Sequence, residues 1–158
     1  MARGRAGRDA KEDLVVQIEP GSGLTIDLHS SVATFYGRQI RELVQRTAAG
    51  LGLSGVRIEV HDKGALDWVI QARVEAAARE LDPSLTAEAL PPVGRPGPDV
   101  QVTRDRMRRS RLYLPGNQPD LMINAGLFEP DGVILDLEDA VAPPQKHAAR
   151  YLVRNALR

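Results

Sequence analysis

A proline-rich stretch divides this sequence into two parts. Five prolines lie between residues 82 and 103: Pro83, Pro91, Pro92, Pro96 and Pro98. Proline lacks the backbone N–H that helix interiors and central strands require, so a segment of this composition is expected to be extended. An arginine-rich run follows it. Residues 82–107 are therefore predicted to be a linker.

The part before the linker carries strand-like alternation and helix-like periodicity. The predicted strands span 14–19, 24–28 and 56–60, and the predicted helices span 32–51 and 66–81. The turn residues 20–23 predict that the first two strands pair as a hairpin. Residues 13–81 are thus expected to form an α+β two-layer sandwich in the order ββαβα. Residues 1–12 are rich in glycine and arginine and are expected to be a flexible N-terminus.

The part after the linker has the pattern of a βα repeat. Short strands are predicted at 112–114 and 132–137, with a helix after the first that Asn117 could cap and a second helix from about Gln145. The second strand is an apolar run that ends in three carboxylates, those of Asp136, Glu138 and Asp139. A buried parallel strand that delivers acids to the mouth of a barrel has this form.

Residues 108–158 are accordingly predicted to be the first βα units of an incomplete TIM-type α/β barrel. A closed barrel needs eight such units and about 250 residues, so residues 104–158 are not expected to pack stably alone.

Composition excludes several classes of function. The formal net charge is zero, so whole-chain electrostatics do not predict binding to nucleic acid or to a membrane. The absence of cysteine excludes disulfides, thiolate metal sites and a cysteine nucleophile, and it fits a cytoplasmic protein. No apolar run approaches the roughly 20 residues of a membrane span. His29, His61 and His147 lack ligand spacing and are interpreted as surface or strand-end residues, so no metal site is predicted in this chain.

A set of short motifs in the first part carries a resemblance to a known family. They are Ala6-Gly7, Asp13 before an apolar strand, Ile18-Glu19-Pro20, Ser30-Ser31-Val32, Tyr36–Arg41 and Asp62–Asp67, followed by 69–76. Through these motifs residues 6–81 resemble the gamma subunit, or acyl carrier protein, of citrate lyase.

The second part carries an independent resemblance. Its motifs are Arg109-Ser110, Leu114–Asn117 and Asp136–Pro143, with Lys146 and Arg150. Residues 108–158 look like the N-terminus of the citrate lyase beta subunit and of related aldolase-type CoA-ester lyases. Because carrier and lyase subunits work together in that system, each resemblance supports the other. Both imply partners of the citrate lyase alpha and beta type in an oligomeric complex.

The lyase resemblance implies roles for five residues. Asp136, Glu138 and Asp139 would form a carboxylate cluster at the barrel mouth; alternatively, they form an acidic turn that caps the next helix. Lys146 and Arg150 could meet a CoA phosphate or a substrate carboxylate, or could lie on an exposed helix face. The principal Mg²⁺ ligands of the family are on later strands. This chain alone is therefore not expected to be catalytically complete, and Mg²⁺ is expected only in the complete lyase.

The carrier resemblance fails at one position that matters for its chemistry. The family attaches a phosphoribosyl-dephospho-CoA arm to a serine just before the first strand. An ungapped alignment from Ala6-Gly7 through Asp13 places Lys11 there, and residues 1–21 contain no serine. The arm is joined through a phosphodiester oxygen, which an amine cannot supply.

Three hypotheses about function follow from the two resemblances. The chain could be a carrier-like component of a system that cleaves citryl thioester to acetyl thioester and oxaloacetate. It could be a degenerate docking or assembly domain of a lyase that acts on free CoA thioesters. It could also be a fragment without a function of its own.

Overall fold

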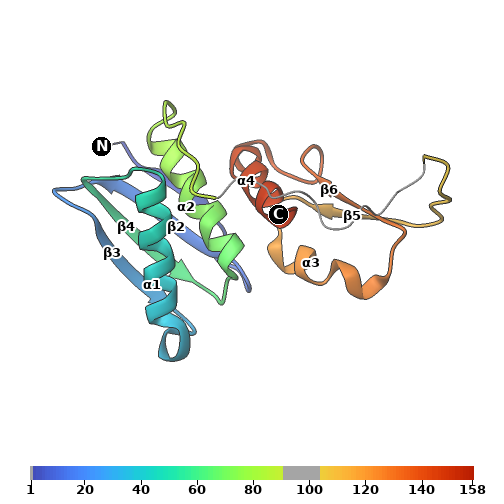
Figure 1. The fold of residues 1–158 in the computed structure, drawn as a ribbon, viewed down its shortest axis with the longest axis horizontal. Coiled ribbons are helices and arrows are strands. Elements are labelled where there is room, and N and C mark those ends of the chain that lie inside the picture. The colour runs from blue at the N-terminus through green and yellow to red at the C-terminus, as the bar shows by residue number, and fades with distance from the viewer. Residues whose placement is uncertain (1, 91–103) are drawn as a thin grey trace.

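The computed structural model describes residues 2–90 and 104–158 (Figure 1). Half of the predicted linker, residues 91–103, lies outside the described residues. The first part contains β1 (Gly4–Gly7), β2 (Leu14–Pro20), β3 (Thr25–Ser30), α1 (Ala33–Gly50), β4 (Val56–Asp62) and α2 (Asp67–Leu81). The second part contains β5 (Arg111–Pro115), α3 (Pro119–Ile123), β6 (Gly132–Asp136) and α4 (Lys146–Ala156), with short 3₁₀ turns at Ala125–Phe128 and Pro143–Gln145.

The first sheet has four strands in the order β1-β2-β4-β3. β2 pairs with β4 in antiparallel orientation, and β3 pairs with β4 in parallel. The predicted hairpin between β2 and β3 is therefore wrong, because β4 lies between them. The reason is the helix that joins β3 to β4: a crossover of that length returns the chain parallel to the strand it left.

The N-terminus is also ordered, contrary to the prediction for residues 1–12. Gly4–Gly7 forms the edge strand β1, which pairs antiparallel with β2. Gly4 lies so close to α2 that a Cβ there would be 1.9 Å from the carbonyl oxygen of Ala77. Because glycine lacks a side chain, this strand has no hydrophobic alternation by which the sequence could reveal it.

The hydrophobic core lies between this sheet and the helices α1 and α2 (Figure 1). The inward faces are those predicted from periodicity: Leu14, Val16, Ile18, Val56, Ile58 and Val60 from the strands, and Ile40, Leu43, Val44, Val69, Ile70 and Val74 from the helices. The outward faces of β3 and β4 carry polar side chains, including Asp27 and Glu59. The part before the linker is thus an α+β two-layer arrangement, as the sequence predicts.

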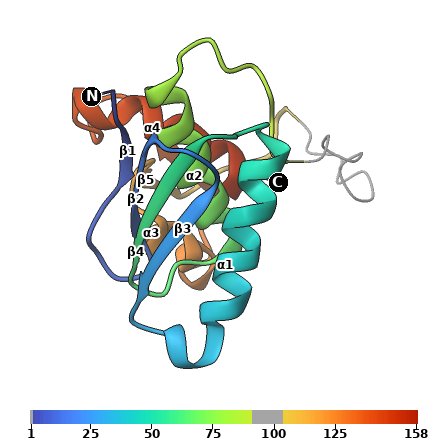
Figure 2. The same cartoon turned by 90° about the vertical axis from the view of Figure 1, so that its left-hand side faces the viewer.

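The second part contributes a two-stranded parallel sheet and a helix that docks on the first part. β5 and β6 pair in register from Arg111↔Gly132 to Pro115↔Asp136. α4 packs against α2, and Leu152 of α4 belongs to the main core with no exposed surface. The two views in Figures 1 and 2 agree that α4 lies beside α2. Residues 104–158 are therefore packed onto the carrier-like part, and the described residues show two parallel strands rather than a closed barrel.

Two further details differ from the sequence-based expectation. The helix α3 begins after Gln118, which is its N-cap residue, so Asn117 does not cap it. The beginning of the predicted linker is not a free tether, because Leu85 and Ala89 pack against the core. None of the helices in the described ranges is long and apolar enough to cross a membrane.

Candidate functional site: the carrier loop and its contact with the second part

The loop between β1 and β2, residues 8–13, is called the carrier loop here. It is anchored by a buried ion pair. Asp13 has no exposed surface and receives two hydrogen bonds from Arg73 of α2, at 3.0 Å from Nε and 2.8 Å from Nη2. The backbone N–H of Leu14 donates a third at 2.8 Å. Burial raises the pKa of Asp13, and the hydrogen bonds and charge of Arg73 oppose that rise. The base of the loop is thus fixed to α2.

Lys11, which the ungapped alignment of the sequence places at the expected attachment position, lies on this loop. Its side chain is 87% exposed, and its amine pairs with Glu12 at 3.3 Å. Residues 1–21 contain no serine, threonine or tyrosine, so no hydroxyl lies on β1, on the loop or on β2. These residues do not fit an arm that is joined through a phosphodiester, because the required oxygen is missing.

Hydroxyl groups do occur in a nearby hollow of about 550 Å³ that Asp9 and Lys63 help to line. Ser30 and Ser31 also line this hollow. The Ser30 hydroxyl donates a hydrogen bond to Asp62 at 2.6 Å and accepts one from the N–H of Val32. These two bonds fix the chain just before the start of α1. Ser31 is exposed.

The carrier loop also contacts the second part of the chain. The carbonyl oxygen of Asn117 accepts hydrogen bonds from Arg73 Nη2 at 3.2 Å and from Arg8 Nη1 at 3.3 Å. Asn117 lies two residues after the end of β5 at Pro115, and the N–H of the intervening Gly116 donates to the carbonyl of Asp136 at 2.7 Å. Since β5 and β6 are parallel, their carboxyl ends meet at one edge. The carrier loop therefore lies against the edge at which α/β barrels place their chemistry.

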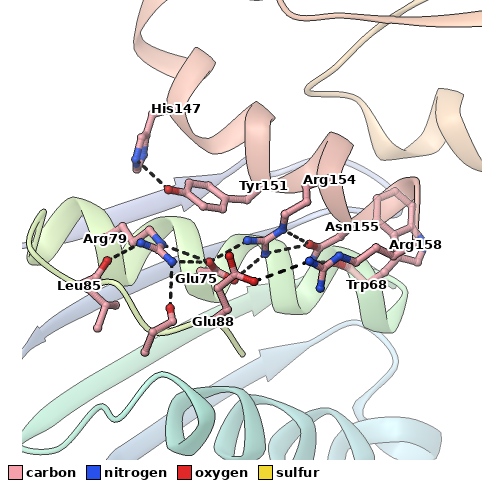
Figure 3. A network of polar contacts seen from close by, with 11 residues as sticks. Trp68, Glu75, Arg79, Leu85, Glu88, His147, Tyr151, Arg154, Asn155 and Arg158 are labelled. Atoms are coloured by element: carbon pink, nitrogen blue, oxygen red, sulfur yellow. Dashed lines mark hydrogen bonds and ion pairs between the residues drawn. The ribbon is translucent and has the colours of Figure 1, made fainter. Parts of the chain in front are cut away.

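A second polar contact joins α2 to α4 (Figure 3). Glu75 of α2 is buried, and Arg154 of α4 donates to both of its oxygens, at 3.0 and 2.6 Å. Arg79 donates to the same carboxylate at 3.1 and 3.0 Å. The hydrogen bond to Glu75 raises the pKa of Arg154. Asn155 donates to the carbonyl of Trp68 at 3.1 Å, so the interface is held along the length of α2.

The predicted carboxylates lie at the carboxyl end of β6, but they do not converge. Asp136 accepts the backbone N–H groups of Glu138 at 2.7 Å and of Ala140 at 3.1 Å, which closes the turn after the strand. Glu138 and Asp139 are exposed. In the part of the chain that the structure describes, these acids are not gathered into a metal-ligating group. Asp136 thus closes the turn after β6, but it does not cap the next helix, because the 3₁₀ turn Pro143–Gln145 and α4 receive no side-chain cap hydrogen bond.

The two predicted cationic residues lie on α4. Lys146 is half-buried at its first residue, and Arg150 is exposed one turn later. Neither reaches a carboxylate within ion-pair distance in the described ranges. Lys146 and Arg150 are therefore positioned on α4 without a carboxylate partner among the described residues.

Sequence reasoning did not predict which residues join the two parts, namely Arg73, Glu75, Asn117 and Arg154. For Arg73 the sequence did contain a signal of such a role. Arg73 lies four residues after Val69 and four before Ala77, on the apolar stripe of α2, where a charged residue requires a buried partner. The partner itself could not be read from the sequence, since it is 60 residues away.

Comparison with known proteins identifies both parts. The family model described as malonate decarboxylase delta subunit matches residues 2–81, about half of the 158-residue chain. A second model, HpcH/HpaI aldolase/citrate lyase, matches residues 109–158. The citrate lyase acyl carrier protein of Haemophilus influenzae (strain ATCC 51907 / DSM 11121 / KW20 / Rd) is 43% identical over 86 residues, covering 54% of this chain and 90% of that protein.

The second part and the fold give further matches. Citrate lyase subunit beta from Leuconostoc mesenteroides subsp. cremoris is 45% identical over 56 residues, which are 35% of this chain and only 18% of that subunit. The crystal structure of a Pseudomonas malonate decarboxylase hetero-tetramer in complex with malonate has one chain with a TM-score of 0.43 and 26% identity, covering 51% of this chain and 84% of that one. The second part is similar to the HpcH/HpaI aldolase/citrate lyase family over residues 109–158, so the order of the two matches is that of a citrate lyase gamma–beta fusion. The chain belongs to the acyl carrier family of malonate decarboxylase delta subunits and citrate lyase acyl carrier proteins.

Proposed function

We propose that residues 2–81 are a docking domain of the carrier type for a citrate-lyase-type CoA-ester lyase, and that they carry no prosthetic arm. The observation behind this proposal is Lys11. It occupies the tip of the only loop that aligns with the family's attachment site, and no hydroxyl lies between residues 1 and 21. A lysine amine cannot replace the serine oxygen in a phosphodiester.

The contacts between the two parts support docking as the retained role. The loop reaches Asn117 through Arg8, and α2 reaches α4 through Glu75. Both contacts are made by the chain's own residues. A domain that holds the carboxyl edge of β5 and β6 in a fixed place would orient the lyase segment, whether or not it delivers substrate.

The reaction proposed for the complete system is cleavage of a carbon–carbon bond in a 3-hydroxyacyl thioester such as a citryl thioester. A base removes the hydroxyl proton, and the oxygen forms the keto group of oxaloacetate as the carbon–carbon bond breaks. The electron pair of that bond passes to the enolate of the acetyl thioester, which takes up a proton before the acetyl thioester is released. Mg²⁺ would supply charge stabilisation at the substrate oxygens. Without an arm, the thioester would be a free CoA ester, and Lys146 and Arg150 on α4 are the candidates to meet its phosphates.

Asp136, Glu138 and Asp139 remain candidates for the mouth of the lyase site. Asp136 would shape the turn through its two backbone hydrogen bonds. Glu138 and Asp139 would face the substrate or the metal shell. Alpha- and beta-type lyase subunits in an oligomeric assembly are the proposed partners.

A second candidate function is a working carrier that uses a different hydroxyl. Ser31 favours it, because this exposed serine lines the same hollow as Asp9 of the carrier loop. In that case the arm would leave from the start of α1 rather than from the loop.

Intact mass of the protein, co-expressed with the citrate lyase prosthetic-group transferase machinery, separates these functions. We expect the wild-type mass to be unmodified, the Lys11→Ser variant to gain the mass of the CoA-derived arm, and an authentic carrier to be modified in parallel. A modified wild-type protein would overturn the docking proposal. Loss of that modification in Ser31→Ala would then establish the second candidate.

A further inference from the structure

The uncovered face of the first sheet brings together three potential metal ligands that are far apart in the sequence. β3 and β4 pair in parallel, and the register places His29 directly beside His61. Glu59 is two residues before His61, so its side chain points to the same face. The neighbours Ile26, Leu28, Ile58 and Val60 pack into the core on the opposite face. All three side chains therefore project away from α1 and α2.

The distances bring these side chains within the reach of one ion. One ligand atom from each of His29, Glu59 and His61 lies within 4.8 Å of the other two. The two imidazole rings are stacked at 4.9 Å between centroids with an interplanar angle of 16°. His61 Nε2 is 2.7 Å from a carboxylate oxygen of Glu59. This is the one group of three or more such residues within the described part of the chain.

We propose that His29, Glu59 and His61 form a binding site for a borderline divalent cation of the Zn²⁺ class. Two neutral imidazoles and one carboxylate are a donor set that suits zinc, and three protein ligands leave a fourth position open.

The surroundings of the cluster allow access to the open position. His29 and His61 line the hollow of about 550 Å³ that also contains Ser31 and Lys63. His29 is exposed on the edge strand β3, so its ring can turn toward a cation without disturbing the core. The cluster and the carrier loop share this hollow through Asp9, which pairs with Lys63 at 3.2 Å.

An ordinary ion pair on a strand face is the competing interpretation. It explains the contact between Glu59 and His61 but gives His29 no role beyond stacking. The two interpretations therefore differ in the effect of replacing His29 on cation binding.

Calorimetric titration of the tag-free, full-length chain with Zn²⁺ tests the site. We expect saturable binding of one Zn²⁺ per chain, weakened at least about tenfold by His29→Ala, by His61→Ala and by Glu59→Gln, since even residues behind a metal ligand change affinity by about 10–100-fold. His147→Ala is the matched control, because His147 is on α4, and it should bind as the wild type does.

A second measurement distinguishes the loss of the metal site from the unfolding of a variant. Co²⁺ in place of Zn²⁺ should give the visible absorption of a four-coordinate site in the wild type and in His147→Ala, but not in His29→Ala, while far-ultraviolet circular dichroism stays unchanged. The proposal is overturned if the wild type shows no saturable Zn²⁺ binding. It is equally overturned if folded His29→Ala binds Zn²⁺ as tightly as the wild type.

Discussion

The ion pair between Glu75 and Arg154 should decide whether α4 stays docked on α2. Glu75 is 1% exposed, and Arg154 donates to it at 3.0 and 2.6 Å. Hydrogen bonds to charged groups contribute about 1.5–3 kcal/mol each. Replacing Arg154 by methionine removes two of them, but Glu75 keeps its bonds from Arg79, and Arg154 is 24% exposed so water already screens it in part. We expect a net loss of about 2 kcal/mol in the docking free energy.

Native-state hydrogen exchange measures this loss locally. A change of about 2 kcal/mol raises the population of the undocked state by roughly thirtyfold, so amides of α4 should exchange about that much faster in Arg154→Met. Amides of β2 and β4 should change much less, because their core does not depend on Arg154. The single tryptophan, Trp68, whose carbonyl accepts from Asn155, offers an independent fluorescence signal for the same event.

The matched control is Arg150→Met on the same helix. Arg150 is exposed, so its replacement should change the exchange of α4 by no more than a typical surface substitution, within about 0.5 kcal/mol. If Arg154→Met and Arg150→Met have the same effect, the ion pair does not hold α4 and the reasoning is refuted. If the ion pair does hold α4, a double-mutant cycle of Arg154→Met and Glu75→Gln should show a coupling free energy between the two residues.

Three further predictions concern the carrier-like part and the start of β5. Arg73→Met should lower the free energy of unfolding by about 3–5 kcal/mol in urea titrations, because it leaves the buried carboxylate of Asp13 without its partner; a loss below about 1 kcal/mol would contradict this. Gly7→Ala should destabilise by at least about 1–3 kcal/mol in thermal melts, since Gly7 has φ of 98° and a Cβ there would be 1.8 Å from the carbonyl oxygen of Leu14. The backbone N–H groups that precede β5 lower the pKa of Asp131, so its stabilising effect is complete above about pH 3.9 and is lost as the pH falls through the lowered pKa; nuclear magnetic resonance of β5 amides should show this loosening in the wild type and not in Asp131→Asn.

The regular elements of the first part could be predicted from the sequence because their burial is one-sided. Leu14, Val16 and Ile18 alternate along β2, and Leu43, Val44 and Ala48 recur with helical spacing along α1. These patterns reflect local geometry that any core imposes. The order of the strands could not be predicted in this way, because both a hairpin and a crossover are compatible with the same alternation in β3.

The candidate site was less predictable, because its residues act through distant partners. The position of Asp136 at the end of β6 follows from the apolar run before it, and the structure confirms that position. The hydrogen bonds that its oxygens accept from backbone N–H groups depend on the conformation of the following turn. Likewise, His29 and His61 lack any motif spacing, and only the parallel register of β3 and β4 brings them together.

The buried pair of Asp13 and Arg73 links the base of the carrier loop to the second part of the chain. A buried ion pair can often be replaced by apolar residues without loss of stability, so stability alone does not account for it. In this chain Asp13 holds Arg73 by two bonds, and the same guanidinium reaches the carbonyl of Asn117 with Nη2. The base of the carrier loop therefore specifies where the end of β5 lies. We propose that a loop fixed in this way by the chain's own residues serves as a docking element, with Lys11 exposed upon it.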